Sequence, residues 1–356
     1  MKLDYSKQDL TELPLIPEGV EELDCSYNQL KTLPPLPKSL KILICNNNRL
    51  KVLPPLPEEL QILDCAVNNI EILFTLPSKL KLLDCSYNEL SCLYLALNEL
   101  EKLNCCFNDL TLLSLECEKL FDLNCSHNQL EALPMNVSAC RFLNCSINSI
   151  DLLPPLAQIV ELECTSNRLS ALPLIGIQCN NLHCGDNRLT QLPVLPDSIE
   201  RLNVSHNLLE EVKILPKSII FFSCVGNRLK YLPYLPNGLK KLLCSYNRLT
   251  FLPSLPFSLE FLSCLANSLT RLPLLSSQVT YLDCRYNTLP YSNLSEYFAY
   301  RQVMKPIYLR KVQRWWRRTN MKRKARAKLE LNTSIYCKPG VGKGWFKFLK
   351  AFDKIA

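Results

Sequence analysis

The chain has 356 residues and a formal net charge of +8, from 41 Lys and Arg against 33 Asp and Glu. With only 8 Gly but 24 Pro, the composition excludes a collagen-like chain and a flexible Gly/Ser linker protein. The sequence contains no run of about 18 apolar residues, which a membrane-spanning helix would need, and its N-terminus has no apolar segment of the secretory type. We therefore expect an intracellular protein.

Residues 1–19 form a polar, degenerate copy of a unit that then repeats as far as residue 290. Tyr5 and Gln8 stand where the later units carry Cys and Asn. We expect this segment to cap the N-terminal end of the repeats.

From residue 20 to 290 the sequence contains fourteen repeats. Cysteines recur with a period of 20 from Cys25 to Cys284; Val204 takes one place, and one residue is missing between Cys145 and Cys164. An asparagine follows each of these positions by three residues, and we expect its side chain to bond backbone groups of its own and the neighbouring turn. The fourteen members of this structural ladder are Asn28, Asn48, Asn68, Asn88, Asn108, Asn128, Asn148, Asn167, Asn187, Asn207, Asn227, Asn247, Asn267 and Asn287.

The complete unit reads L-x-x-L-x-C-x-x-N-x-L-x-x-L-P-x-L-P, as in residues 40–57 and 239–256. The alternation in L-x-C predicts a short strand with Leu and Cys inward, and twenty residues leave no room for a helix on the other side. The L-P-x-L-P segment favours an extended return path, since Pro fixes φ and needs no amide partner. We therefore predict a solenoid with a curved all-parallel β-sheet on the concave side, an extended polyproline-like convex side and a basic α-helical tail.

This unit resembles the leucine-rich-repeat family, most closely the short 20-residue bacterial-effector type of YopM and the IpaH ligases, whose repeats also carry L-P-x-L-P. The resemblance covers roughly residues 1–290 and departs from that type by having Cys where an aliphatic residue is usual. The segment 312–318 beside such repeats also resembles giant-virus leucine-rich-repeat proteins. The ligase domain of the IpaH proteins is far larger than this tail and uses a Cys-x-Asp nucleophile, whereas Cys337 precedes Lys338 and Pro339, so we expect no ligase activity.

The cysteine column has two interpretations. Thiols on neighbouring strands about 4.8 Å apart could bind metal or pair. Inward-facing cysteines in apolar surroundings act instead as small hydrophobes, and we favour this packing role, with no metal site and no cofactor. So many thiols indicate a reducing compartment, which for an effector or viral protein would be the host cytoplasm.

Function is expected in the variable positions, which we place on the concave sheet. Aromatic residues recur just before the ladder asparagines, and carboxylates precede several cysteines, a composition typical of protein-binding surfaces. The alternative is that these residues only solvate the sheet, but exposed aromatic residues in register favour partner binding. All three histidines fall in these positions; a metal or catalytic cluster is the alternative to contact residues. The predicted partner-binding residues are Tyr27, Asp64, Asp84, Tyr87, Phe107, His127, His183, His206, Tyr246 and Tyr286.

Residues 291–356 change the composition sharply, with 17 Lys and Arg against 3 Asp and Glu. We expect one helix from Asn293 to Met304 and a second from Pro306 to about Asn332. The segment from 312 to 322 resembles the IQ motif, with Val for Ile, Arg for Gly and Lys for the final Arg, which implies binding of a calmodulin-like protein. The predicted docking residues of the tail are Val312, Gln313, Trp316, Arg317, Arg318 and Lys322.

Two other partners fit the same tail. The basic run could bind nucleic acid or anionic lipid, or it could be a solvated helix that lies against the acidic repeats. Residues 345–355 form a short basic amphipathic segment that could lie on a membrane or act as a cap. The sequence thus predicts a non-catalytic scaffold that binds an unidentified protein on its concave face and takes no small-molecule substrate. In the alternative, the tail binds the partner and the repeats are the scaffold.

Overall fold

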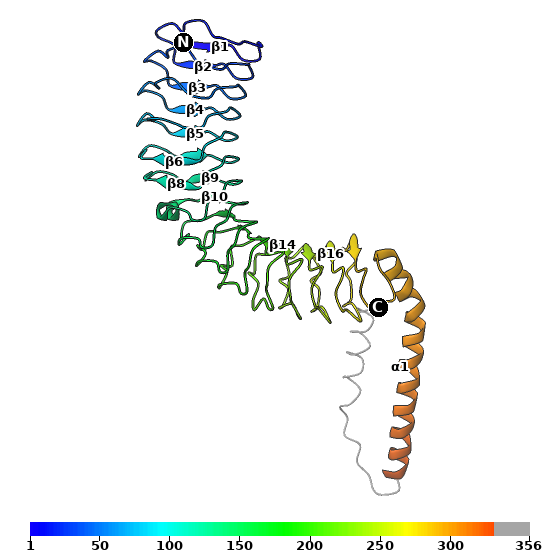
Figure 1. Cartoon of the computed structure of the whole chain (residues 1–356). Helices are drawn as coiled ribbons and strands as arrows, with labels where there is room; N and C mark the ends of the chain where they lie inside the picture. Colours follow the sequence, from blue (N-terminus) through cyan, green and yellow to red (C-terminus); the bar gives the residue numbers. More distant parts are fainter. Residues whose placement is uncertain (331–356) are drawn as a thin grey trace.

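The computed structural model describes the backbone of residues 1–330, with the side chains of residues 1–304 and of part of the helix that follows. Short parallel strands stack into a long, bent solenoid that ends against a helix (Figure 1). The prediction of an all-parallel solenoid sheet is confirmed. The fifteen strands of the main sheet are, in spatial order, β1 (Lys2–Asp4), β2 (Glu22–Asp24), β3 (Ile42–Ile44), β4 (Ile62–Asp64), β5 (Leu82–Asp84), β7 (Lys102–Asn104), β9 (Asp122–Asn124), β10 (Phe142–Asn144), β11 (Glu161–Glu163), β12 (Asn181–His183), β13 (Arg201–Asn203), β14 (Phe221–Ser223), β15 (Lys241–Leu243), β16 (Phe261–Ser263) and β17 (Tyr281–Asp283).

Each strand has three residues, and its middle residue points into the core. Leu23 of β2 is fully buried, while Glu22 and Asp24 on either side face outward. The strands pair in register, so that Glu22 is opposite Ile42 and Asp24 opposite Ile44. Equivalent residues therefore form two outward-facing columns on the sheet, which we call the first-position column and the third-position column.

The ladder asparagine bonds to the backbone of the residue that follows each strand, usually a cysteine, and so holds neighbouring turns together. The Asn68 amide nitrogen lies 3.1 Å from the carbonyl oxygens of both Cys65 and Cys45 and 3.2 Å from that of Ala66. Its side-chain oxygen accepts the Leu50 backbone N–H at 2.9 Å. The same set of bonds recurs at the other ladder positions as far as Asn287. Each asparagine thus bridges its own turn and the one before it.

The convex side is extended and free of strands over most of the solenoid, with one exception. Strands β6 (Cys92–Leu95) and β8 (Leu112–Leu115) form a two-stranded parallel sheet there, in which Tyr94 is opposite Ser114. This departs from the polyproline-like prediction because these two units lack the L-P-x-L-P prolines, so their backbone N–H groups are available for a ladder. A 3₁₀ helix, Met135–Ala139, follows in the next unit.

The C-terminal helix α1 runs without interruption from Leu294 to Glu330, so the prediction of two helices separated at Pro306 is wrong. Its start is capped: the Asn293 side-chain oxygen accepts the Glu296 N–H at 3.0 Å, and the Glu296 carboxylate accepts the Ser292 N–H at 2.7 Å. Pro306 removes only one helical hydrogen bond, and the residues that follow are rich in the strong helix formers Lys, Arg and Ala. Among the described residues, no helix is both long and apolar enough to cross a bilayer.

Candidate functional site

The residue before each ladder asparagine lies in the turn after the strand, at one edge of the sheet. The non-glycine residues at these positions have φ between +50° and +55°, the left-handed region. We call this column the edge ridge. Its members are Tyr27, Asn47, Val67, Tyr87, Phe107, His127, Ile147, Ser166, Asp186, His206, Gly226, Tyr246, Ala266 and Tyr286. The predicted aromatic contact residues therefore lie beside the sheet, not on its strands.

Aromatic side chains of the edge ridge are exposed, from 38% for Phe107 to 78% for Tyr286. Three consecutive members form one stack. The Phe107 ring lies 4.2 Å from the Tyr87 ring and 3.8 Å from the His127 ring, with interplanar angles of 10° and 18°. The three stacked rings form a continuous aromatic edge across three turns.

The two predicted carboxylates, Asp64 and Asp84, belong to the third-position column and have a local role. Asp84 accepts the backbone N–H of Ser86 at 3.0 Å, and Asp64 accepts that of Ala66 at 3.1 Å. Asp and Asn recur at this column because a side-chain oxygen there closes the turn that follows. Burial raises the pKa of Asp64, against the opposing effect of the Ala66 hydrogen bond. These carboxylates therefore stabilise the turns that follow their strands, and their contact with a partner stays a prediction.

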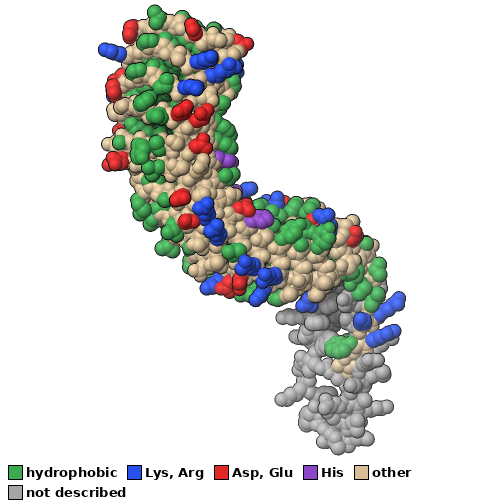
Figure 2. Space-filling model, in the orientation of Figure 1, with side chains coloured by type: hydrophobic (Ala, Val, Ile, Leu, Met, Phe, Trp, Pro, Cys, Tyr) green, Lys and Arg blue, Asp and Glu red, His purple; other side chains and the backbone are tan. Residues whose placement is uncertain are grey.

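The three histidines do not meet. His127 is part of the aromatic stack, His183 is in the third-position column on β12, and His206 is on the edge ridge. Figure 2 shows histidine side chains at separate places around the bend. His206 covers Gly226, where a Cβ atom would lie 2.6 Å from its Nδ1 atom. Among the side chains that the structure describes, no group of three or more His, Cys, Asp or Glu could hold a metal ion.

The cysteine column is buried, and its thiols are weak donors. The Sγ atom of Cys65 lies 3.4 Å from the Asp84 carbonyl oxygen, on the next strand. Burial raises the pKa of Cys145 and of Cys184 to about 12. Such thiols stay protonated at neutral pH and are poor nucleophiles and poor metal ligands. Of the eighteen cysteines in the described part of the chain, Cys92 alone is exposed.

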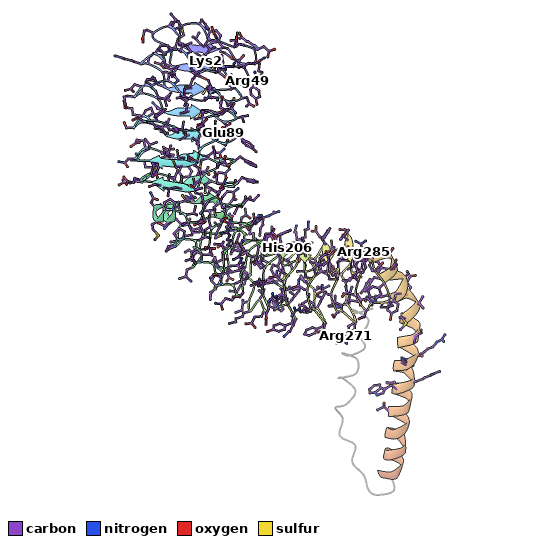
Figure 3. The ribbon with its side chains drawn as sticks, viewed as in Figure 1. Lys2, Arg49, Glu89, His206, Arg271 and Arg285 are labelled. Atoms are coloured by element: carbon purple, nitrogen blue, oxygen red, sulfur yellow. The ribbon has the colours of Figure 1, made fainter. Side chains whose placement is uncertain are left out.

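The first-position column holds residues that the sequence analysis missed. In its C-terminal half, two cations and three aromatic rings occupy five consecutive strands, in the order Arg201, Phe221, Lys241, Phe261 and Tyr281. A signal was available, because these residues recur three places before Val204 and the following cysteines. Figure 3 shows this sheet on the inner side of the bend, with His206 and Arg285 along it and Arg271 on the opposite side.

On helix α1, Gln313 and Trp316 of the IQ-like segment are exposed. The side chains of Val312, Arg317, Arg318 and Lys322 lie outside the described part, as do residues 331–356. The docking role of the tail stays a prediction.

No protein-family model and no curated protein matches the chain, but solved structures do. YopM from Yersinia enterocolitica WA-314 has a TM-score of 0.63 and 29% identity, covering 81% of this chain and 78% of that one. YopM from Yersinia pestis, described as a leucine-rich effector protein, has a TM-score of 0.68 and 28% identity, covering 80% and 88%. The functional domain of InlJ from Listeria monocytogenes, which includes a cysteine ladder, has a TM-score of 0.63 and 23% identity, covering 75% and 58%. The fold of this chain is therefore the leucine-rich-repeat solenoid, similar to that of YopM.

Proposed function

We propose that this chain is a non-catalytic scaffold that binds a protein partner on its concave sheet and edge ridge. The similar structures are leucine-rich-repeat proteins, which supports a general binding role. An extended, curved sheet with outward-facing columns is suited to a long partner surface.

One observation carries the proposal: large side chains occupy the edge ridge against the conformational preference of its backbone. Left-handed φ favours Gly, Asn and Asp, and it is most unfavourable for β-branched residues. Yet Val67 and Ile147 have φ of +55°, and the exposed Tyr87 and Phe107 have φ above +50°. Since about two fifths to one half of each of these side chains still faces solvent, contact with a partner is the reason we assign to them.

The test is a full-chain variant with Tyr87→Asn and Phe107→Asn, compared with wild type in capture of partners from cell lysate. Asparagine suits the left-handed backbone, so the fold should be kept while the apolar edge is lost. The matched control is Phe74→Asn with Phe257→Asn, which removes two exposed aromatics outside the edge ridge. The proposal predicts loss of captured proteins only in the ridge variant; equal capture by all three chains would refute it.

The tail gives the second candidate function, binding of a calmodulin-like protein. Its support is that helix α1 is uninterrupted and that Gln313 and Trp316 are exposed on it, because such proteins bind a helix that presents an exposed apolar anchor. Anionic membrane and nucleic acid remain the other partners proposed for the basic tail. Full-chain Trp316→Ala with Gln313→Ala should lose calcium-dependent capture of an EF-hand protein if this function holds, and capture that is unchanged would refute it.

We also propose a reducing intracellular compartment as the place where the protein works. The support is the seventeen buried free thiols among the described residues, whose protonated state suits such conditions.

A further inference from the structure

The C-terminal half of the first-position column is a continuous ladder of cations and rings. The Arg201 guanidinium lies 5.6 Å from the Phe221 ring centroid. The Lys241 ammonium lies between two rings, 5.6 Å from that of Phe221 and 4.6 Å from that of Phe261. The Phe261 and Tyr281 rings stack at 4.0 Å with an interplanar angle of 6°. We call these five residues the cation–aromatic column; its rings hold the two cations in place on the sheet.

The two cations of this column have no carboxylate partner among the described residues. Neighbouring Lys240, by contrast, approaches the Glu260 carboxylate at 3.7 Å. The outward positions of strands β12 to β16 carry no Asp or Glu, and Asp283 on β17 is bound by Arg285 at 2.8 Å. The positive charges of Arg201 and Lys241 are therefore uncompensated on this part of the sheet.

The N-terminal part of the same face has the opposite character. Its outward strand positions carry eight carboxylates and only two lysines, Lys2 and Lys102. The acidic residues of these strands are Asp4, Glu22, Asp24, Asp64, Asp84, Asp122, Glu161 and Glu163. The concave face is thus divided into an acidic part over the main-sheet strands from β1 to β11 and a cationic, aromatic part over β12–β17.

We infer that the cation–aromatic column binds an extended acidic peptide segment, with one carboxylate on Arg201 and another on Lys241. This rests on the proposed function and names the chemistry of its partner at one part of the surface. The carboxylates of the peptide would accept charge-assisted hydrogen bonds from Arg201 and Lys241, which have no carboxylate partner within the described residues. The Phe221 ring, which lies between the two cations, would contact the residues between the carboxylates, and the Phe261 and Tyr281 rings would contact residues beyond the carboxylate on Lys241.

The arrangement of the rings favours a peptide over nucleic acid. Nucleic acid is bound by stacking of bases on open aromatic faces. Here the face of Phe261 is covered by Tyr281 on one side and by the Lys241 ammonium on the other. A long polyanion would also run onto the carboxylates of the N-terminal part, whereas a short acidic segment would not.

The spacing of the cations sets the spacing of the acidic residues. Arg201 and Lys241 are two strands apart, which is about 10 Å. A peptide in polyproline II geometry rises about 3.1 Å per residue with three residues per turn, so residues three apart lie about 9 Å apart on one side. The column therefore fits acidic residues at positions i and i+3 of an extended peptide.

The experiment measures fluorescence polarisation of the full chain with a rhodamine-labelled peptide of four Glu-Pro-Ala repeats at low salt. A peptide of four Lys-Pro-Ala repeats is the charge control. We expect saturable binding of the acidic peptide alone and at least about tenfold weaker binding by Arg201→Gln with Lys241→Gln. The matched protein control, Arg228→Gln with Lys240→Gln, removes the same charge nearby and should change the affinity less than twofold.

Equal weakening by both double variants would show non-specific attraction and overturn the inference, as would tighter binding of a twelve-residue oligothymidine. Lys241→Glu keeps a charged residue in the column and should shift preference toward the Lys-Pro-Ala peptide; no shift would also overturn the inference. The lysate assay separates the two proposals. If ridge-dependent capture persists while the acidic peptide fails to bind, only this inference fails.

Discussion

Replacing Asn68 by leucine should lower the free energy of unfolding by about 3 kcal/mol. The side chain is buried and satisfies four backbone groups in two turns. Leucine has a similar volume but can neither donate nor accept, so the change removes the ladder bonds without creating a large cavity.

The magnitude follows from the bonds that are lost. The buried N–H of Leu50 loses its acceptor, which costs about 1–3 kcal/mol. The carbonyls of Cys45 and Cys65 each keep one donor, from Asn48 and Asn88, so they lose strength rather than all partners. The weakened carbonyls add on the order of 1 kcal/mol.

The assay is urea denaturation of the full chain under reducing conditions, followed by circular dichroism. The neighbouring Asn69 provides the same substitution on the surface, where its amide bonds only the exposed Glu89 carboxylate. Asn69→Leu should change stability by less than about 0.5 kcal/mol. If the two variants lose the same free energy, the reasoning that the ladder stabilises the stack through buried backbone groups is wrong.

Three further predictions concern the edge ridge and the cysteine column. Ile147→Asn should raise the free energy of unfolding by about 1 kcal/mol, because it removes the strain of a β-branched residue at left-handed φ. Asn47→Ile at an equivalent position should lower the free energy of unfolding by a similar amount, and thermal melts measure both changes. Burial raises the pKa of thiols such as Cys145 from 9.0 to about 12, so the native state keeps protons that the unfolded chain releases at high pH. The free energy of unfolding should therefore stay constant below about pH 9 and fall toward pH 12, with a loss of about 1.4 kcal/mol for each such thiol at pH 10. A denaturation midpoint that does not change between pH 9 and pH 12 would contradict this. Cys145→Val should cost less than about 1.5 kcal/mol at pH 7, because Val204 is fully buried at the equivalent position, and should reduce the alkaline loss when measured by the same denaturation series.

The repeat pattern was sufficient to predict the fold class because the interactions that define it recur at a constant spacing. The three-residue offset from Cys65 to Asn68 is the same in every unit, so equivalent residues of successive turns stack in register. The helix of the tail did not follow from the sequence pattern in the same way. Pro306 predicted a break between two helices, yet α1 continues through it because strong helix formers offset the one missing hydrogen bond.

The candidate surface shows where sequence reasoning stops. The sequence shows that Tyr87 and Phe107 are unusual at exposed positions. Only the backbone φ values place them in a turn at the sheet edge and show that a large side chain there has a conformational cost. Asp84 looked like a contact residue until its hydrogen bond to the Ser86 N–H showed a turn-closing role. The cation–aromatic column is not evident from the sequence because its residues are twenty positions apart and contact one another only across neighbouring strands.

The sequence by itself determined the number of turns, the inward and outward positions and the buried ladder, since each follows from a local pattern repeated at one period. Tertiary structure alone decided which outward residues touch across turns, as in the stack of Tyr87, Phe107 and His127. It also decided where the convex side forms strands β6 and β8. The physical reason is that contacts between turns depend on side-chain orientation and backbone pairing in three dimensions, which periodicity does not specify.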